Sequence, residues 1–366
     1  MASSGPAVIV VEDDPFPRLI QVVLDPATPI ARREAFAHFF SHDLPDFPGW
    51  CEALGARLPR LYPASVRLVS SESALLEAIH GAQAAVVESL PVASRAIDAG
   101  ASTLRIVQKY GTVVGNIDVE ACRRAGVRVR TLRRRANIAC AEHAFALMLA
   151  LARKISATRG LVSVEQLRAA GYTPTQYDRS HTANANWARI PGIRTLYGQQ
   201  LGIVGLGEIG REVALRAKAF GMLLVYTQRR RLAPEDEAGY QARYVSLDQL
   251  LATSDFISLH LPETDSTRGI IGARELSRVK PGTVIVNVSR PPLVERGALL
   301  EALRAGVLGG FGLDPHYDAP GQPDDPLLEF GNVIVTPHIA AAPRFNALGD
   351  FEELLIGLDR ALGEKT

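Results

Sequence analysis

From about residue 200 onward, short runs of aliphatic residues alternate with longer stretches in which apolar residues recur every three or four positions. The short apolar runs predict buried strands, and the longer amphipathic stretches predict helices. Their alternation predicts parallel βαβ units in an open sheet with helices on both faces. The predicted strands are 201–207, 222–228, 255–262, 283–289, 309–314 and 333–338, and the predicted helices are 208–220, 246–254 and 297–306.

The first 130 residues alternate less regularly and predict a second, smaller α/β domain. Candidate strands are 7–11, 66–70, 84–89, 104–111 and 127–131, with helical patterns at 73–81 and 119–126. Residues 137–160 are rich in Ala and Leu and predict one long helix, which we interpret as a connector between domains. Residues 172–198 predict an irregular excursion because Pro, Gly, Asn and Thr are frequent there, and the aromatic-rich stretch 26–50 has no pattern that assigns it a purpose.

The bulk composition is that of a globular protein rather than of a nucleic-acid or membrane protein. The 366 residues leave room for two domains, 47% of them are hydrophobic and 22% are charged. A net charge of +1 gives no argument for nucleic acid or an acidic membrane surface, and no apolar run approaches the roughly 20 residues that span a bilayer. The three cysteines have no metal-ligand spacing and the N-terminus lacks the basic flank of a secretion signal, so we expect a cytoplasmic protein without a metal site.

A glycine motif in the second half predicts a dinucleotide site. The sequence LGIVGLGEIGREVA places Gly205, Gly207 and Gly210 in the pattern G-x-G-x-x-G, between a predicted strand and a predicted helix. The first glycine permits a tight turn, the second lets a pyrophosphate approach the backbone, and the third allows close packing of helix on strand. The N-terminus of the helix, here Glu208 and Ile209, then presents free N–H groups to the phosphates.

The end of the next predicted strand favours NADP(H) over NAD(H). An acidic residue there would hold the adenosine ribose 2′-hydroxyl of NAD, but this chain has Gln228 followed by Arg229, Arg230 and Arg231. Guanidinium groups bind a 2′-phosphate through charge-assisted hydrogen bonds, whereas a carboxylate would repel it. The alternative is a solvated basic loop with no role in cofactor choice.

Three further stretches resemble the D-isomer-specific 2-hydroxyacid dehydrogenases. They are VNVSRPPLVERGALLEAL with Arg290, GGFGLDPHYDAP with Asp314, and VIVTPHIA with His338. Together with KYGTVVGNID, CAEH, the glycine motif and SLHLPET, they occur in the order of that family over roughly residues 80–345.

The resemblance implies two Rossmann-like domains with the active site in the cleft between them. A parallel-sheet cofactor domain, 137–338, would be inserted into a flavodoxin-like substrate-binding domain made of 1–136 and 339–366. It also implies a homodimer joined through the helix 137–160, and it places His260, Pro262 and Asp314 at the cofactor.

The chemistry of the family assigns two catalytic residues. Hydride transfer to a 2-oxo acid creates negative charge on the carbonyl oxygen, so a proton donor must face it, and a histidine such as His338 titrates near neutral pH. Arg290 would bind the carboxylate in a bidentate fork and polarise the carbonyl. The resemblance also places the substrate carboxylate on the turn formed by Gly111, Thr112 and Val113, although Val113 stands where a second glycine is common. The alternative for Arg290 is a salt bridge at the end of a strand, and the alternative for His338 is a buried structural histidine.

The pattern departs from the family at the active site. The glutamate that normally pairs with the catalytic histidine is replaced by Ala319, which cannot accept a hydrogen bond or stabilise an imidazolium, so Asp318 is a candidate substitute. Pro291 and Pro292 replace the usual glycines after Arg290 and should stiffen the pocket wall.

The turn Arg133, Arg134 and Arg135 stands where the family has a Pro-Gly turn. We interpret it either as a basic pocket for a second anionic group or as an exposed turn between domains.

Two other functions remain open. The chain could be a dinucleotide-sensing binding protein without significant turnover, as in the corepressor branch of the family. It could also abstract a hydride directly from a substrate that needs no histidine–glutamate pair, as in the formate dehydrogenase branch, although that branch has Gln at the position of Ala319. The leading hypothesis is an NADP(H)-preferring oxidoreductase of 2-oxo and 2-hydroxy acids.

Overall fold

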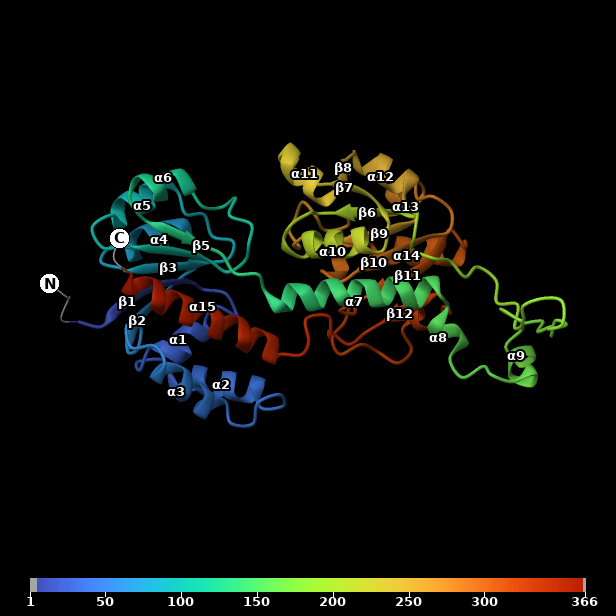
Figure 1. The fold of residues 1–366 in the computed structure, drawn as a ribbon, viewed down its shortest axis with the longest axis horizontal. Coiled ribbons are helices and arrows are strands. Elements are labelled where there is room, and N and C mark those ends of the chain that lie inside the picture. The colour runs from blue at the N-terminus through green and yellow to red at the C-terminus, as the bar shows by residue number, and fades with distance from the viewer. Residues whose placement is uncertain (1–4, 365–366) are drawn as a thin grey trace. The chain divides into compact units, whose positions relative to one another are not determined.

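The computed structural model describes residues 5–364, which divide into two compact units. The first unit runs to Ile138 and resumes at Ala342, and the second spans Ala139–Ala341. The sequence placed these two boundaries after residues 136 and 338. Each unit is built around its own parallel sheet, as predicted, and the second is inserted into the first (Figure 1).

The sheet of the first unit has the strand order β2-β1-β3-β4-β5, and all its pairs are parallel. This is the flavodoxin-like order, so the predicted fold class is confirmed. One face packs against α1, α3 and α15 and the other against α4, α5 and α6. The strands are β1 (Ala7–Glu12), β2 (Ala64–Val69), β3 (Ala84–Val87), β4 (Ile106–Lys109) and β5 (Arg128–Arg130); the helices are α1 (Leu19–Leu24), α2 (Ile30–Phe40), α3 (Phe47–Ala56), α4 (Glu72–Ala78), α5 (Ser94–Gly100), α6 (Val119–Arg124) and α15 (Phe345–Gly363).

The sheet of the second unit has the order β12-β11-β10-β9-β6-β7-β8, again all parallel, which extends the doubly wound dinucleotide-binding order by one strand. Both faces are covered, so the strands read as continuous Val, Ile and Leu runs. The strands are β6 (Gln200–Val204), β7 (Leu223–Thr227), β8 (Ala242–Tyr244), β9 (Phe256–Leu259), β10 (Thr283–Asn287), β11 (Leu308–Leu313) and β12 (Val333–Val335). The helices are α7 (Arg135–Ala152), which begins in the first unit, α8 (Ile155–Thr158), α9 (Val164–Ala169), α10 (Glu208–Ala219), α11 (Pro234–Tyr240), α12 (Leu247–Thr253), α13 (Ala273–Leu276) and α14 (Arg296–Arg304), with 3₁₀ turns η1 (Pro291–Leu293) and η2 (Pro326–Glu329).

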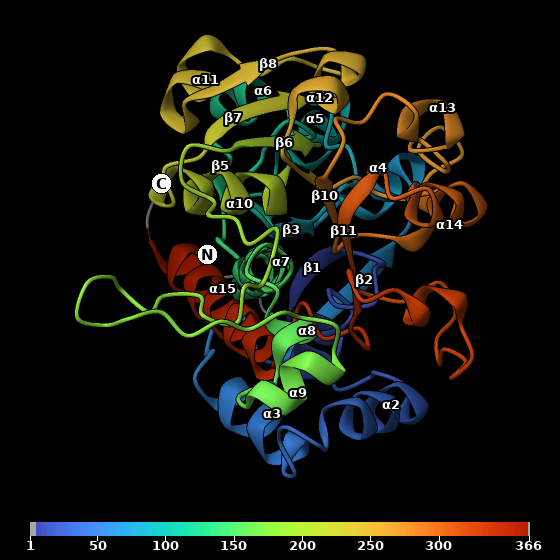
Figure 2. The ribbon, with the colours of Figure 1, turned by 90° about the vertical axis from the view of Figure 1, so that its right-hand side faces the viewer.

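The prediction of one helix over 137–160 is wrong at its C-terminal end. Helix α7 stops at Ala152, whose carbonyl accepts a hydrogen bond from the backbone N–H of Arg194 at 2.9 Å. Lys154 then adopts a left-handed conformation, with φ of 58°, before the short helix α8. In a longer helix this carbonyl would accept the next hydrogen bond of the helix. Here it is occupied by Arg194, which lies far along the chain. The irregular excursion is confirmed, since residues 172–199 contain neither helix nor strand (Figure 2).

The stretch 26–50, which the sequence did not explain, forms helices α2 and α3 in the first unit. Its aromatic rings pack against one another in a continuous series. Phe16 contacts Phe39, Phe39 and Phe36 contact Phe40, Phe40 stacks on Phe47, and Phe47 stacks on Trp50. These aromatic rings therefore pack the two helices against the hydrophobic core of the unit.

Candidate functional site

The three glycines of the G-x-G-x-x-G motif have the geometry that a dinucleotide requires. Gly205 follows β6 with φ of 95°, and a Cβ there would lie 2.6 Å from the carbonyl oxygen of His260. At Gly210 a Cβ would lie 2.2 Å from the carbonyl oxygen of Gly205, so helix α10 packs directly on the turn. A Cβ at Gly207 would meet nothing within 4 Å, so this side of the turn is open to a ligand. Helix α10 begins at Glu208 and has no side-chain cap, which suits it to bind phosphate.

The arginine run after β7 separates into one engaged residue and two available ones. Arg231 donates two hydrogen bonds to Glu237, at 2.9 and 2.8 Å, and this pairing lowers the pKa of Glu237 to about 2. Arg229 and Arg230 are exposed, and no ion pair to either is found within residues 5–364. Gln228 joins this loop to the glycine turn, because its Oε1 accepts the N–H of Leu206 at 3.0 Å and its Nε2 donates to the carbonyl of Arg230 at 2.6 Å.

His260 and Pro262 follow β9, the strand beside β6. The backbone N–H of His260 donates to Val204, and its Nε2 lies 2.8 Å from the hydroxyl of Ser258. Burial lowers the pKa of His260 to about 3, so the ring is neutral near pH 7. We therefore expect His260 to shape the turn around Gly205 rather than to carry charge to a ligand.

Arg290, Asp314 and His338 follow three neighbouring strands, β10, β11 and β12, at their carboxyl ends. The ends of β6, β7 and β9 carry the glycine turn, Gln228 and His260. The structure therefore brings the predicted residues of the second unit to one edge of one sheet, where ligands bind in open α/β folds. The guanidinium of Arg290 is exposed and donates to the carbonyl of Ser289 at 2.9 Å, and within residues 5–364 it makes no ion pair.

Asp314 holds the segment that carries His338. Its side chain is 1% exposed, and its two oxygens accept the Thr336 hydroxyl at 2.7 Å and the N–H groups of Ile339 and Ala340 at 2.9 and 3.1 Å. The Nε2 of His143 lies 2.9 Å from the same Thr336 oxygen. Because the threonine proton points to Asp314, His143 donates its Nε2 proton to the threonine. Asp314 was predicted at the cofactor, whereas its hydrogen bonds connect it to the backbone around His338.

His338 itself is exposed and adopts a left-handed conformation, with φ of 58°. A side-chain-bearing residue with such a φ is uncommon and costs about 1 kcal/mol or more, so the surrounding hydrogen bonds must enforce it. The three bonds to Asp314 do so, since they fix residues on either side of His338. His143 and Thr336 were not among the predicted site residues, although both lie inside the family motifs CAEH and VIVTPHIA.

The loop around Ala319 has a different charge arrangement from the one predicted. Asp318 lies 3.3 Å from Nη1 of Arg296, and the other terminal nitrogen of Arg296 pairs with Asp325. His316 Nε2 lies 2.9 Å from Asp325 Oδ2, so His316, Asp318 and Asp325 form a group of metal-ligand types. The guanidinium of Arg296 already occupies the position of a cation against both carboxylates, and we assign no metal to this group. The carboxylate of Asp318 thus has a partner other than His338.

The predicted carboxylate turn lies in the first unit. Gly111, Thr112 and Val113 follow β4, and the carbonyl of Gly111 accepts the N–H of Leu132 at 2.8 Å. At the arginine turn, Arg134 forms an ion pair with Glu88, and Arg135 binds Asp350 and Glu353 at 3.0 and 2.8 Å. Arg134 and Arg135 are therefore both engaged by carboxylates of the chain itself. The basic pocket stays a prediction, whereas the alternative of an exposed turn is wrong for Arg134, whose side chain is 12% exposed.

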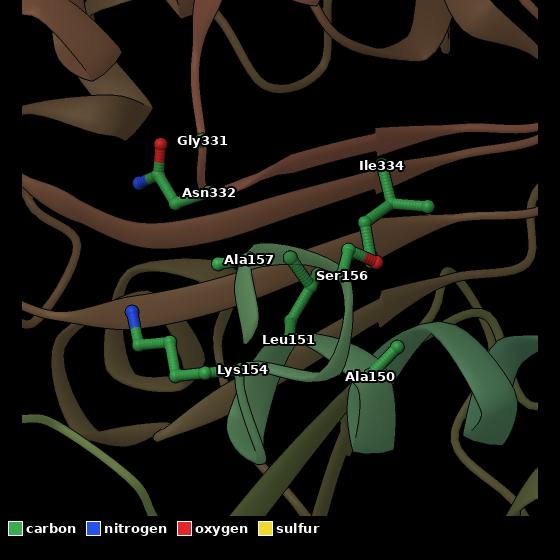
Figure 3. Close-up of a pocket in the computed structure, with 8 residues that line it drawn as sticks. All are labelled: Ala150, Leu151, Lys154, Ser156, Ala157, Gly331, Asn332 and Ile334. Atoms are coloured by element: carbon green, nitrogen blue, oxygen red, sulfur yellow. The ribbon is translucent and has the colours of Figure 1, made fainter. Parts of the chain in front are cut away.

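The hollow between the C-terminal end of α7, α8 and β12 is too small to bind a substrate (Figure 3). It is lined by Leu151, Lys154, Asn332 and Ile334 among others, and its volume of about 10 Å³ holds at most one water molecule. Among the helices formed by residues 5–364, none combines the length and apolar character needed to cross a membrane.

Comparison with known proteins agrees with the residue pattern. The sequence model of the D-isomer specific 2-hydroxyacid dehydrogenase, NAD binding domain, matches residues 145–340. The chain is 40% identical over 244 residues to the glyoxylate reductase of Korarchaeum cryptofilum, covering 66% of this chain and 68% of that protein. It is 36% identical over 282 residues to the D-3-phosphoglycerate dehydrogenase of Archaeoglobus fulgidus. The aligned region covers 76% of this chain but only 49% of that protein, so the chain spans about half the length of that relative.

Solved structures show the same fold. The crystal structure of a glyoxylate reductase from Paecilomyes thermophila superimposes with a TM-score of 0.54 at 27% identity, covering 98% of this chain and 97% of that one. The family model covers more than half of the chain, and the motifs that it contains lie at one edge of one sheet. The chain therefore belongs to the D-isomer specific 2-hydroxyacid dehydrogenase family.

Proposed function

We propose that this protein interconverts a 2-oxo acid and the D-2-hydroxy acid, with NADP(H) as its preferred cofactor. The observation that carries the proposal is that Arg290 and His338 follow β10 and β12, and Asp314 follows the strand between them, at the edge of the sheet where the glycine turn lies. A cation for the carboxylate and a group that can give a proton thus accompany the dinucleotide site.

The chain's own residues supply binding, polarisation and proton transfer. When bound, a nicotinamide cofactor supplies or accepts the hydride. Gly205, Gly207 and Gly210 would hold its pyrophosphate at the start of α10. Arg290 would grip the substrate carboxylate and polarise the carbonyl, and His338 would give the proton to the developing alkoxide, or remove it in the reverse reaction. Asp314 would keep His338 in position through Thr336, Ile339 and Ala340.

The substrate class follows from the engaged arginines. Because Arg134 and Arg135 pair with Glu88, Asp350 and Glu353, neither of these two arginines is available to bind a second anionic group. We therefore favour a substrate with a single carboxylate bound at the turn of Gly111, Thr112 and Val113. The named relatives make glyoxylate and D-3-phosphoglycerate the natural pair to compare.

We also propose a homodimer in the cytoplasm. Large apolar side chains are exposed on the second unit next to the start of β7, among them Tyr197 at 78% and Leu223 at 61%. They lie close together, since the Tyr197 ring contacts Gly221 and the N–H of Leu223 donates to Gln199. A second copy that covers this patch would remove it from water, and Leu223→Glu should then shift the mass measured by light scattering from dimer to monomer.

The test is the oxidation of NADPH and NADH with a panel of 2-oxo acids, and the reverse reaction with D-3-phosphoglycerate. Loss of a general acid typically lowers the rate about 10²- to 10⁴-fold, so His338→Asn should do so while the exposed His181→Asn should not. Arg290→Met should raise KM and lower kcat, with Arg304→Met as the matched control. The replacement of the usual glutamate by Ala319 favours one alternative, a cofactor-sensing protein, which would bind NADPH tightly without turnover and would not respond to loss of Arg290.

A further inference from the structure

Arg134 is a buried cation that the proposed mechanism does not use. It stands in the turn between β5 and α7, its side chain is 12% exposed, and it forms an ion pair with Glu88, which is 32% exposed. A buried ion pair is expensive to desolvate and is a poor stabiliser when compared with apolar residues of the same size. Its presence therefore calls for another explanation.

The guanidinium of Arg134 lies over the ring of Tyr110, 4.0 Å from its centroid. The same ring stacks on Phe351 of α15, with centroids 4.9 Å apart and planes inclined by 21°. Tyr110 is 1% exposed and directly precedes Gly111. The residue before the predicted carboxylate turn is thus immobilised through its ring, which contacts both Arg134 and Phe351.

The other members of this cluster are also fixed. The N–H of Glu88 donates to Glu12 at 2.5 Å, and the carbonyl of Glu88 accepts from the Lys109 amine. Glu12 also accepts the N–H groups of Ser89 and Leu90, at 2.9 and 3.0 Å. The carboxylate that holds Arg134 therefore stands on a rigid backbone at the carboxyl end of β3.

The turn at Gly111 is held from two sides that meet at Arg134. The N–H of Leu132, two residues before Arg134, donates to the Gly111 carbonyl at 2.8 Å. The ring of Tyr110 lies beneath the guanidinium. Glycine loses more conformational freedom on ordering than any other residue, so a turn led by glycine is only as well positioned as the groups that flank it. Arg134 contacts one of these flanking groups, the Tyr110 ring, and lies two residues from the other, Leu132.

We propose that Arg134, together with Glu88 and Tyr110, is a positioning residue that fixes the turn of Gly111, Thr112 and Val113 for the substrate carboxylate. The inference rests on the proposed function and concerns this same site. Arg134 acts through Tyr110 and does not itself contact the substrate. The arginine turn thus contributes to substrate affinity by rigidity, not by adding charge to the pocket.

The test compares variants in kinetics and in equilibrium binding. Arg134→Met leaves Glu88 unpaired and could fail to fold, so the principal variant is Arg134→Met with Glu88→Gln, which removes both charges and keeps the volumes. We expect KM for the 2-oxo acid and Kd for oxamate, an unreactive analogue measured by calorimetry with NADPH present, to rise about tenfold, or about 1.4 kcal/mol. The value of kcat should fall less than about threefold and Kd for NADPH should stay unchanged, because the cofactor residues lie in the other unit. Arg134→Lys restores a cation without the planar fork and should recover part of the affinity.

Arg124→Met, at an exposed position at the end of α6 in the same unit, is the matched control and should leave every parameter within about twofold of the wild type. A folded double variant with wild-type KM and wild-type oxamate affinity overturns the inference and leaves the proposed function intact. Equal losses of substrate and NADPH affinity overturn it as well, because they reveal only a general structural role. A wild-type protein that neither reduces 2-oxo acids nor binds oxamate refutes the proposed function, and the inference with it.

Discussion

Cofactor choice can be tested at Arg229 and Arg230, the two arginines of the loop after β7 that make no ion pair within residues 5–364. A hydrogen bond to a charged group contributes about 1.5–3 kcal/mol, and exposure to solvent and salt favours the lower end of that range. Each arginine should therefore favour NADPH by about tenfold, since 1.4 kcal/mol is one factor of ten. The variant with both residues changed to Met should lose up to about a hundredfold in kcat/KM for NADPH and at most threefold for NADH.

Arg231 provides the internal control for this prediction. Its guanidinium already donates twice to Glu237, at 2.9 and 2.8 Å, and cannot bind a phosphate in the same geometry. Arg231→Met should change the ratio of the two kcat/KM values less than about threefold. Glu237→Gln should release Arg231 and raise the preference for NADPH.

The assay is the initial rate of NADPH and NADH oxidation at saturating 2-oxo acid and at two salt concentrations. The preference for NADPH should decline as ionic strength rises, because the contacts are exposed charges. A wild-type preference for NADH, or an unchanged ratio in the double variant, would show that the arginines are a solvated loop and refute the reasoning.

Three further predictions concern the supports of the site. Asp314→Asn should lower kcat at least tenfold, with a smaller effect on NADPH binding. An amide has only one acceptor oxygen and cannot accept the three hydrogen bonds from Thr336, Ile339 and Ala340 as the carboxylate does. Equal kcat in variant and wild type would contradict this. Asp350→Ala should lower the free energy of unfolding, measured in urea, by roughly 1.5–3 kcal/mol, because Asp350 is fully buried and binds both the backbone and the side chain of Arg135. The control Glu353→Gln, at an exposed position, should lower it by less than about 1 kcal/mol. The pKa of Glu237 is lowered to about 2, so its ion pair with Arg231 stabilises the loop fully at pH values above the ordinary carboxyl pKa of about 4.5. This stabilisation is lost as the pH falls from about 4.5 to 2. An NMR titration of Glu237 with an unshifted midpoint would disprove the pairing.

The sequence by itself determined the fold class and most of the second unit. Buried parallel strands must be continuous apolar runs, and the helices between them must be amphipathic, so both units were visible as repeating patterns. The glycine motif could be interpreted residue by residue because each glycine is required by a local close contact, such as the one between Gly210 and the carbonyl of Gly205. The family motifs then placed Arg290, Asp314 and His338 at consecutive strand ends.

Tertiary structure alone decided which of the charged residues are engaged. Nothing local to the run Arg229–Arg231 or to the run Arg133–Arg135 says which guanidinium meets a carboxylate. Glu88 and Asp350 lie 46 and 215 residues from their arginine partners, so these pairings depend on how the elements pack. Glu237 is only 6 residues from Arg231, but it lies on α11, and its contact depends on how that helix folds back on the loop. The same holds for the end of α7, where a hydrogen bond from Arg194 stops a helix that propensity alone would have continued. Periodicity is a property of single elements, whereas the neutralisation of a charge or the capture of a carbonyl depends on contacts between distant segments, which no local pattern encodes.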